Sequence, residues 1–69
     1  MEAFVIIYKH TNKKPEIMNI SSNIHAASFK FESYVKLAKY ENASHVYLCK
    51  ATLKNGEWYM NEIIEKKAI

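Results

Sequence analysis

The clearest pattern of apolar and polar positions lies near the C-terminus, in the stretch TLKNGEWYMNEII at residues 52–64. Asn55 and Gly56 both tolerate positive φ, so they favour a type I′ turn between two antiparallel strands. Counting outward from this turn, Leu53 faces Trp58 and Ala51 faces Met60. One face of the hairpin then carries mostly apolar side chains, with Glu62 as the misfit: Leu53, Trp58, Ala51, Met60, Cys49, Tyr47 and Ile64.

That face is expected to pack in the core, with Trp58, Leu53 and Met60 inserted under a helix. The opposite face is polar near the turn and apolar farther away, at Val46, Leu48 and Ile63. Residues 57–67 also show a helical spacing, because Tyr59 and Ile63 are four residues apart. The strand is favoured over the helix because the Asn-Gly turn is a strong local signal.

Two further segments complete the predicted sheet. Residues 3–10, AFVIIYKH, form a nearly continuous apolar run, which is typical of a central strand that is buried on both faces. Residues 16–21, EIMNIS, follow Pro15 and could return as an edge strand, since proline cannot donate a hydrogen bond to a neighbouring strand.

The segment between the two halves predicts an amphipathic helix. Apolar residues recur every three or four positions, which is the pattern of one helix face. Ser21, Ser22 or Asn23 can cap its start, and Asn42 is a suitable left-handed stop. The expected fold is therefore a small α+β domain of the type ββαββ over residues 1–69, with a mainly antiparallel sheet and one helix on one face.

Size and composition narrow the functional class. A chain of 69 residues buries only about 60% of its unfolded surface, and domains of this size often need a disulfide, a metal or a partner. Cys49 is the only cysteine, so an internal disulfide is excluded. The sequence shows neither an export signal nor an apolar run of membrane-spanning length, so we expect a cytoplasmic protein.

Catalytic and metal chemistry find little support. The candidate ligands His10, His25, His45 and Cys49 are dispersed, and on a strand His45 and Cys49 lie about 13 Å apart, too far for one metal ion. A core thiol stays protonated and inert, and no Asp or glycine-rich phosphate loop is present. We expect neither an enzyme nor a metal or cofactor site.

Nucleic-acid binding is the alternative function. The isoelectric point is near 9.0 and the net charge is +3. All ten basic residues are lysines, whereas arginine, which reads guanine bidentately, is absent. Sequence-independent binding through phosphate contacts and stacking would use Lys9, Lys13, Lys14, Lys50, Lys54, Tyr8 and Tyr59.

Protein binding is the favoured function. A sheet with one helix leaves its second face bare, and apolar patches of that extent are typical of interfaces. The expected interface consists of Val46, Leu48, Lys50, Tyr59, Asn61 and Ile63, and it would serve a homodimer or a protein partner. A composition rich in Lys, Asn, Ile and Tyr is typical of AT-rich genomes. It suggests a phage or mobile-element accessory protein that modulates a host protein in the host cytoplasm.

Overall fold

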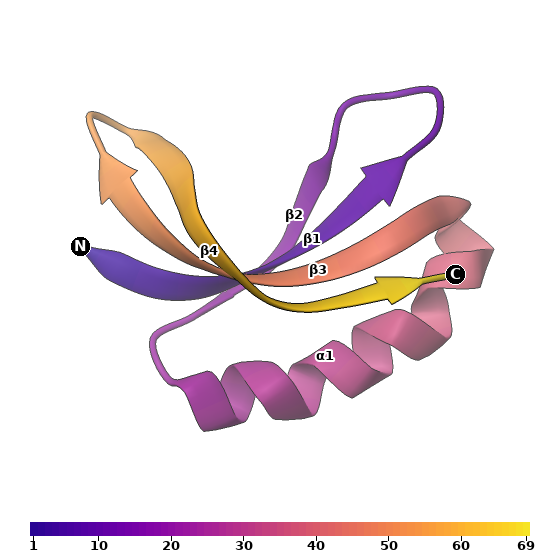
Figure 1. The fold of residues 1–69 in the computed structure, drawn as a ribbon, viewed down its shortest axis with the longest axis horizontal. Coiled ribbons are helices and arrows are strands. Elements are labelled where there is room, and N and C mark those ends of the chain that lie inside the picture. Colours follow the sequence, from indigo (N-terminus) through magenta and orange to yellow (C-terminus); the bar gives the residue numbers. More distant parts are fainter.

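The computed structural model describes all residues from Met1 to Ile69 and contains one four-stranded antiparallel sheet with one helix packed on it (Figure 1). The elements follow the order β1 (Glu2–His10), β2 (Glu16–Ser21), α1 (Ile24–Ala38), the 3₁₀ turn η1 (Lys39–Glu41), β3 (Ala43–Lys54) and β4 (Glu57–Ala68). The strand order is β2-β1-β3-β4. The predicted α+β class and the ββαββ order are therefore confirmed, and residues 57–68 form a strand rather than a helix.

Helix α1 begins as the sequence predicts, whereas it ends at Ala38 and the predicted stop, Asn42, ends the 3₁₀ turn η1 that follows. The Asn23 side-chain oxygen accepts hydrogen bonds from the backbone N–H groups of His25 (2.7 Å) and Ala26 (3.2 Å). These bonds satisfy donors that have no partner inside the helix. At the other end, Asn42 follows η1 with φ of 58°, the left-handed conformation that ends a helix and lets the chain turn into β3.

The larger core lies between α1 and the sheet. Ile6 and Tyr8 of β1 pack with Val46 and Leu48 of β3, and all four are almost completely buried. From the helix, Ala27, Phe31 and Ala38 join the same cluster. The Tyr8 hydroxyl donates a 2.6 Å hydrogen bond to the Tyr34 carbonyl oxygen, so this buried polar group is satisfied and ties β1 to α1.

The predicted facing of the β3–β4 hairpin is wrong. Val46 and Leu48 lie beneath α1, whereas Cys49, Ala51 and Trp58 belong to a smaller cluster on the other side of the sheet. The reason is that α1 packs on β1, β2 and β3, and the cluster beneath it ends at Leu48. On the α1 side of the hairpin, the residues between Leu48 and the turn lie beyond this cluster, so they can be polar. The prediction placed this face outward because its residues near the turn are polar. Its apolar residues far from the turn, Val46 and Leu48, belong to the core.

Two bulges in β4 correct the predicted register. Lys50 pairs with Glu62 while Ala51 pairs with Met60, so Asn61 is an extra residue. Leu48 pairs with Glu65 while Cys49 pairs with Ile63, so Ile64 is a second one. Because a bulge shifts the alternation of faces by one residue, Glu62 leaves the apolar face and Ile63 takes its place. This explains why Glu62 is a misfit in an unbroken register.

The two remaining strands have the predicted positions. β1 is central, and its residues from Val5 to Tyr8 are buried although they alternate between the two faces. β2 is a short edge strand, and Pro15 lies in the loop just before it. The turn between β3 and β4 has φ of 54° at Asn55 and 79° at Gly56, as a type I′ turn requires.

The corrected facing gives a stability prediction. Leu48→Ala removes a fully buried side chain beneath α1 and should cost about 2–5 kcal/mol of unfolding free energy. Leu53→Ala, in the half-buried turn end of the same strand, is the matched control and should cost clearly less. Urea unfolding of both variants measures the difference, and equal losses would contradict the facing described above.

Candidate docking surface

The face of the sheet opposite α1 is hollowed. The β1–β2 hairpin and the turn end of the β3–β4 hairpin both bend away from α1 (Figure 1). On this face, a hollow of about 440 Å³ lies between the two hairpins. It is lined from the β1–β2 side by Ile7, Lys9, Pro15 and Ile17, and from the β3–β4 side by Tyr47, Cys49, Met60 and Ile63. We call this surface the open-face trough.

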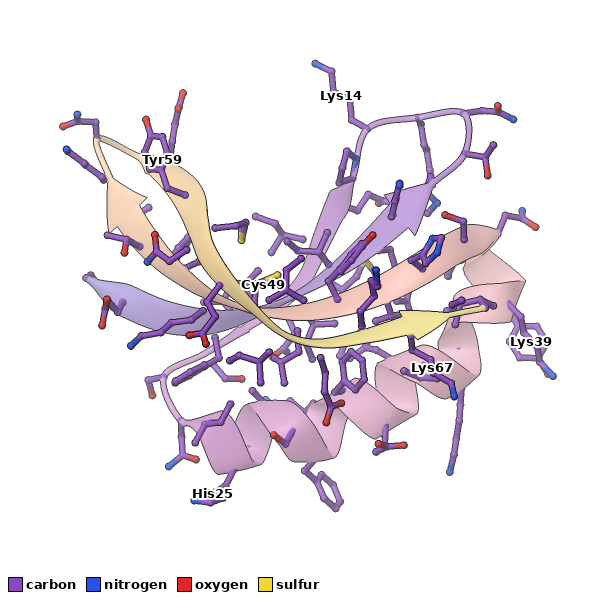
Figure 2. The ribbon with its side chains drawn as sticks, in the orientation of Figure 1. Lys14, His25, Lys39, Cys49, Tyr59 and Lys67 are labelled. Atoms are coloured by element: carbon purple, nitrogen blue, oxygen red, sulfur yellow. The ribbon has the colours of Figure 1, made fainter.

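Its floor is a second small core. Val5, Ile7, Cys49 and Ala51 are buried although no helix covers them. Half-buried Tyr47 and Trp58 pack against them and shield them from one side. Cys49 lies at the centre of this floor (Figure 2).

The walls expose large apolar side chains to solvent. Ile17 on one wall is 45% exposed, and Met60 and Ile63 on the other are 41% and 58% exposed. Three side chains of this kind around one hollow form a contiguous apolar surface rather than scattered exposure. The trough is therefore the part of the sheet that a partner would cover with the greatest hydrophobic gain.

Charges are distributed unevenly between the two faces of the sheet. Directly paired residues share a face, so the pairs Lys9–His45 and Tyr47–Lys66 place two lysines on the open side. Lys14, in the β1–β2 loop, points away from the sheet on that side as well (Figure 2). No glutamate lies there. Five glutamates pair with residues on the α1 side and two lie on α1 and η1: Glu2, Glu16, Glu57, Glu62, Glu65, Glu32 and Glu41.

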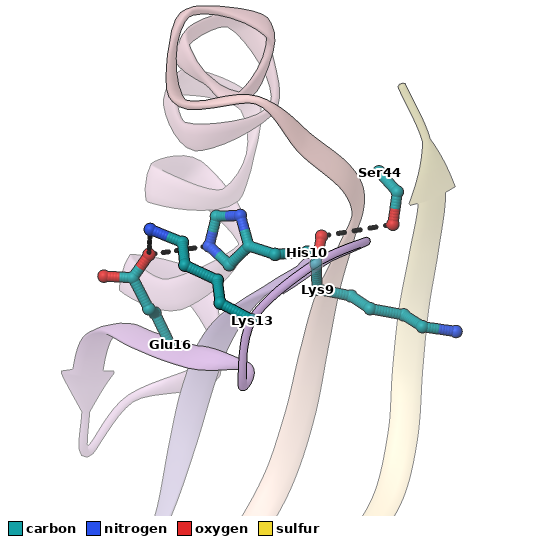
Figure 3. Close-up of polar contacts among 5 residues, drawn as sticks. All are labelled: Lys9, His10, Lys13, Glu16 and Ser44. Atoms are coloured by element: carbon teal, nitrogen blue, oxygen red, sulfur yellow. Dashed lines mark hydrogen bonds and ion pairs between the residues drawn. The ribbon is translucent and has the colours of Figure 1, made fainter.

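One end of the open face also carries two stacked rings. The imidazole of His45 and the ring of Tyr47 have centroids 6.1 Å apart and planes inclined by 20°. His45 Nδ1 lies 3.1 Å from the Ser44 hydroxyl oxygen, and that hydroxyl donates to the Lys9 carbonyl oxygen at 3.2 Å (Figure 3). These contacts hold the cationic end of the trough in place between β1 and β3.

Most residues of the predicted interface lie elsewhere. Val46 and Leu48 are fully buried beneath α1 and cannot contact a partner. Lys50, Tyr59 and Asn61 belong to the α1 side of the hairpin. Lys50 Nζ lies 3.8 Å from Glu2 Oε1, and the Asn61 amide donates a 2.6 Å hydrogen bond to the Thr52 hydroxyl. Of the predicted set, only Ile63 lines the trough.

The predicted nucleic-acid residues do not form one surface either. Tyr8 is buried and bonded to α1, and Lys13 pairs with Glu16 at 3.1 Å. Lys54 and Tyr59 lie near the β3–β4 turn on the α1 side, together with Lys50. Only Lys9 lines the trough, and Lys14 lies in the loop beside it.

Sequence reasoning missed most of the trough. Ile17 and Pro15 were placed on an edge strand and its loop, without a surface role. Tyr47, Cys49 and Met60 were assigned to the helix-covered core. The available signal was the excess of apolar residues on both faces of the hairpin, which one helix cannot cover.

A polar corner at the far end of β1 is the other concave site. His10 Nε2 lies 2.6 Å from Glu16 Oε1, and Lys13 Nζ approaches the same oxygen (Figure 3). The hydrogen bond from Lys13 has the largest effect and lowers the pKa of Glu16; desolvation opposes it, and the close contact with His10 lowers the pKa further by a smaller amount. No three histidine, cysteine or acidic side chains of the chain gather as a metal site would require.

Comparisons with known protein families, with curated proteins and with solved structures found no match for this chain. None of its helices has both the length and the apolar character needed to cross a membrane.

The thiol on the trough floor gives a chemical prediction. Burial raises the pKa of Cys49, so little thiolate is present near neutral pH. We expect the native protein to react with iodoacetamide at least about ten-fold more slowly than the urea-unfolded chain, because the thiolate is the nucleophile and Cys49 is only 3% exposed. Mass spectrometry of timed samples gives both rates, and comparable rates would show that the floor is accessible.

The polar corner gives a pH prediction. The pKa of Glu16 is lower in the folded state than its ordinary value of 4.5, so its carboxylate stabilises the fold above that pH. The contribution should disappear as the pH falls through the lowered folded-state pKa. Glu16→Gln should therefore reduce the urea midpoint slightly at neutral pH and leave it close to the parent's once the pH is below the lowered folded-state pKa. An equal deficit at both pH values would mean that the loss is not electrostatic.

Proposed function

We propose that this protein is a binding module that docks an apolar, acidic segment of a partner protein into the open-face trough. The observation that carries the proposal is the combination of an exposed apolar hollow with a cationic end and no glutamate on the same face. Apolar burial would supply the affinity, while Lys9 and Lys66 would select and orient a negatively charged segment. The proposal needs no catalytic group.

The shape of the trough favours a convex occupant. An amphipathic helix laid in a hydrophobic groove is a recurring mode of recognition, and its apolar face would contact Ile17, Met60 and Ile63. A second copy of the chain suits this surface poorly, because two concave faces cannot fill each other and their lysines would approach one another. The expected homodimer through the open sheet face is therefore not part of the proposal.

Strand addition at the edge of the sheet is less well supported. β4 is a long edge strand, but its bulges at Asn61 and Ile64 interrupt the row of backbone groups that an added strand would need. Charged residues along the strand, including Lys66 and Lys67, further disfavour edge pairing. The side chains of the trough therefore offer more to a partner than the backbone of β4.

Nucleic-acid binding also has weaker support than protein binding. The walls of the trough are mainly aliphatic, whereas a single-strand platform presents aromatic rings for stacking. The composition typical of AT-rich genomes is consistent with a phage or mobile-element protein that modulates a host protein. We keep that origin as part of the proposal.

The test uses a titration followed by nuclear magnetic resonance. An acidic amphipathic helical peptide should shift the signals of Ile7, Ile17, Met60 and Ile63, whereas a basic peptide with the same apolar residues should have little effect. Ile63→Ser should weaken binding by roughly ten-fold or more, since truncating a central interface anchor typically costs over 1 kcal/mol. Tyr59→Ser is the matched control on the opposite side of β4, and it should bind like the parent.

Two outcomes would overturn the proposal. One is the absence of trough shifts with the acidic peptide. The other is a set of trough shifts produced by a single-stranded oligonucleotide instead, with a steep dependence on salt. The second outcome would assign the same face to nucleic acid.

A further inference from the structure

Helix α1 has a second apolar surface that faces solvent. Its inner side packs on the sheet through Ala27, Phe31 and Ala38. On its outer side, Phe29 is 80% exposed, Leu37 is 52% exposed, and Tyr40 in the following η1 is 72% exposed. α1 lies on the outer side of the molecule (Figure 1). The Tyr40 ring is partly covered by Lys39, whose Nζ lies 5.2 Å from the ring centroid, while Phe29 and Leu37 face solvent.

These residues form one narrow stripe. At about 100° per residue, Ala26, Phe29, Ser33 and Leu37 fall within an arc of roughly 80°, and Tyr40 extends the line into η1. Ala26 and Ser33 are exposed and small, and they lie on either side of Phe29 along the stripe. We call this surface the outer stripe. It is nearly opposite the buried face, so solubility of the monomer does not explain its apolar character.

The width and composition of the outer stripe indicate the kind of partner. A narrow seam with spacings of three and four residues is typical of one helix packing against another. The small side chains of Ala26 and Ser33 would let a second helix approach closely. A helix that lies on a membrane presents a broader apolar face with few small residues, so lipid suits the outer stripe less well.

We propose that the outer stripe forms a two-fold dimer in which the α1 helices of two copies pack antiparallel, with Ser33 at the axis. The sequence is self-complementary about this position. Phe29 is four residues before Ser33 and Leu37 is four residues after it, so each Phe29 lies opposite Leu37 of the second copy. Ala26 and Tyr40 are likewise seven residues on either side, which places a small side chain opposite a large one.

Charges beside the outer stripe support the same register. Glu32 and Lys36 flank the stripe on one side of the helix, and both are exposed. In a two-fold antiparallel pair, each flank meets the same flank of the other copy. Lys36 of one copy then lies about two residues, or about 3 Å along the axis, from Glu32 of the other. Both copies contribute, so two such opposite-charge contacts form across the dimer, against one approach of Glu32 to Glu32 of the second copy at the same separation along the axis.

This dimer is independent of the proposed docking function and leaves its surface free. The helices would meet at the centre, so the two open-face troughs would lie on the outer sides of the dimer. A partner with two acidic segments could then bind both copies and gain avidity. The dimer would also give additional burial to a chain too small to form an extensive core alone.

Disulfide cross-linking tests the register directly. In a Cys49→Ala background, Ser33→Cys should form a covalent dimer under mild oxidation, because the two thiols would meet at the axis. Ser28→Cys, which is exposed on the same helix but well away from the outer stripe, is the matched control and should remain monomeric. Equal cross-linking of both variants, or none with Ser33→Cys, would overturn the proposed register.

Sedimentation tests the dimer itself. We expect the parent to sediment at twice its mass of 8.1 kDa with a dissociation constant on the order of 10 µM, as suits a contact below about 1,200 Å². Leu37→Glu should weaken the dimer at least 100-fold without lowering the urea midpoint of the dilute monomer. Ile63→Lys, which changes the trough only, should dimerise like the parent.

Three results would contradict the dimer. The first is a parent that stays monomeric at high concentration, and the second is a dimer that Ile63→Lys abolishes while Leu37→Glu does not. The third is a monomeric parent that binds vesicles of phosphatidylserine and phosphatidylcholine and loses that binding in Leu37→Glu. This last result would assign the outer stripe to a membrane surface. None of the three depends on whether the trough binds an acidic peptide.

Discussion

The whole structure depends on a constraint of coverage: one helix of 15 residues can shield only one face of a four-stranded sheet. β1 and β3 are apolar on both faces, so hydrophobic burial drives the packing of α1 on one side and leaves the other side to protect itself. The sheet does so by bending. Its two hairpins rise on this side (Figure 1), and Val5, Ile7, Cys49 and Ala51 are buried with Tyr47 and Trp58 packed against them, without a second layer. The open-face trough is a consequence of this bending.

The bulges in β4 connect local sequence to this shape. Each extra residue increases the twist of the strand and changes which side chains face the trough. Asn61 is fixed in its bulge by a hydrogen bond to Thr52, and Ile63 consequently enters the wall of the trough. With an unbroken register, Glu62 would occupy that wall and place a carboxylate on the open face. The absence of glutamate from the trough therefore depends on backbone geometry as much as on composition.

Much of the fold could be predicted from the sequence because its signals are local. The Asn55–Gly56 turn, the Asn23 cap and the left-handed Asn42 each follow from the conformational preferences of one or two residues. The facing of β3 was not local, because it depends on where α1 crosses the sheet. The bulges also could not be located from the alternation of apolar and polar residues. The alternation showed that Glu62 did not fit the apolar face, but it did not show that an extra residue in β4 was the reason. The prediction of the candidate site was wrong for the same reason, because its residues come from both hairpins. Only the bent sheet brings Ile17 close to Met60 and Ile63.

Coverage also connects the two proposed surfaces. This chain of 69 residues needs most of its apolar side chains for two small cores. Phe29, Leu37 and Tyr40 are nevertheless exposed at the outer surface, where polar residues could replace them without loss of packing. The trough floor, by contrast, must be apolar because the strands are shared with the helix-covered core. Exposure in the trough therefore follows partly from the fold, whereas exposure of the outer stripe has no structural cause within one chain. The exposure of Phe29 and Leu37 therefore supports the proposed self-association through α1.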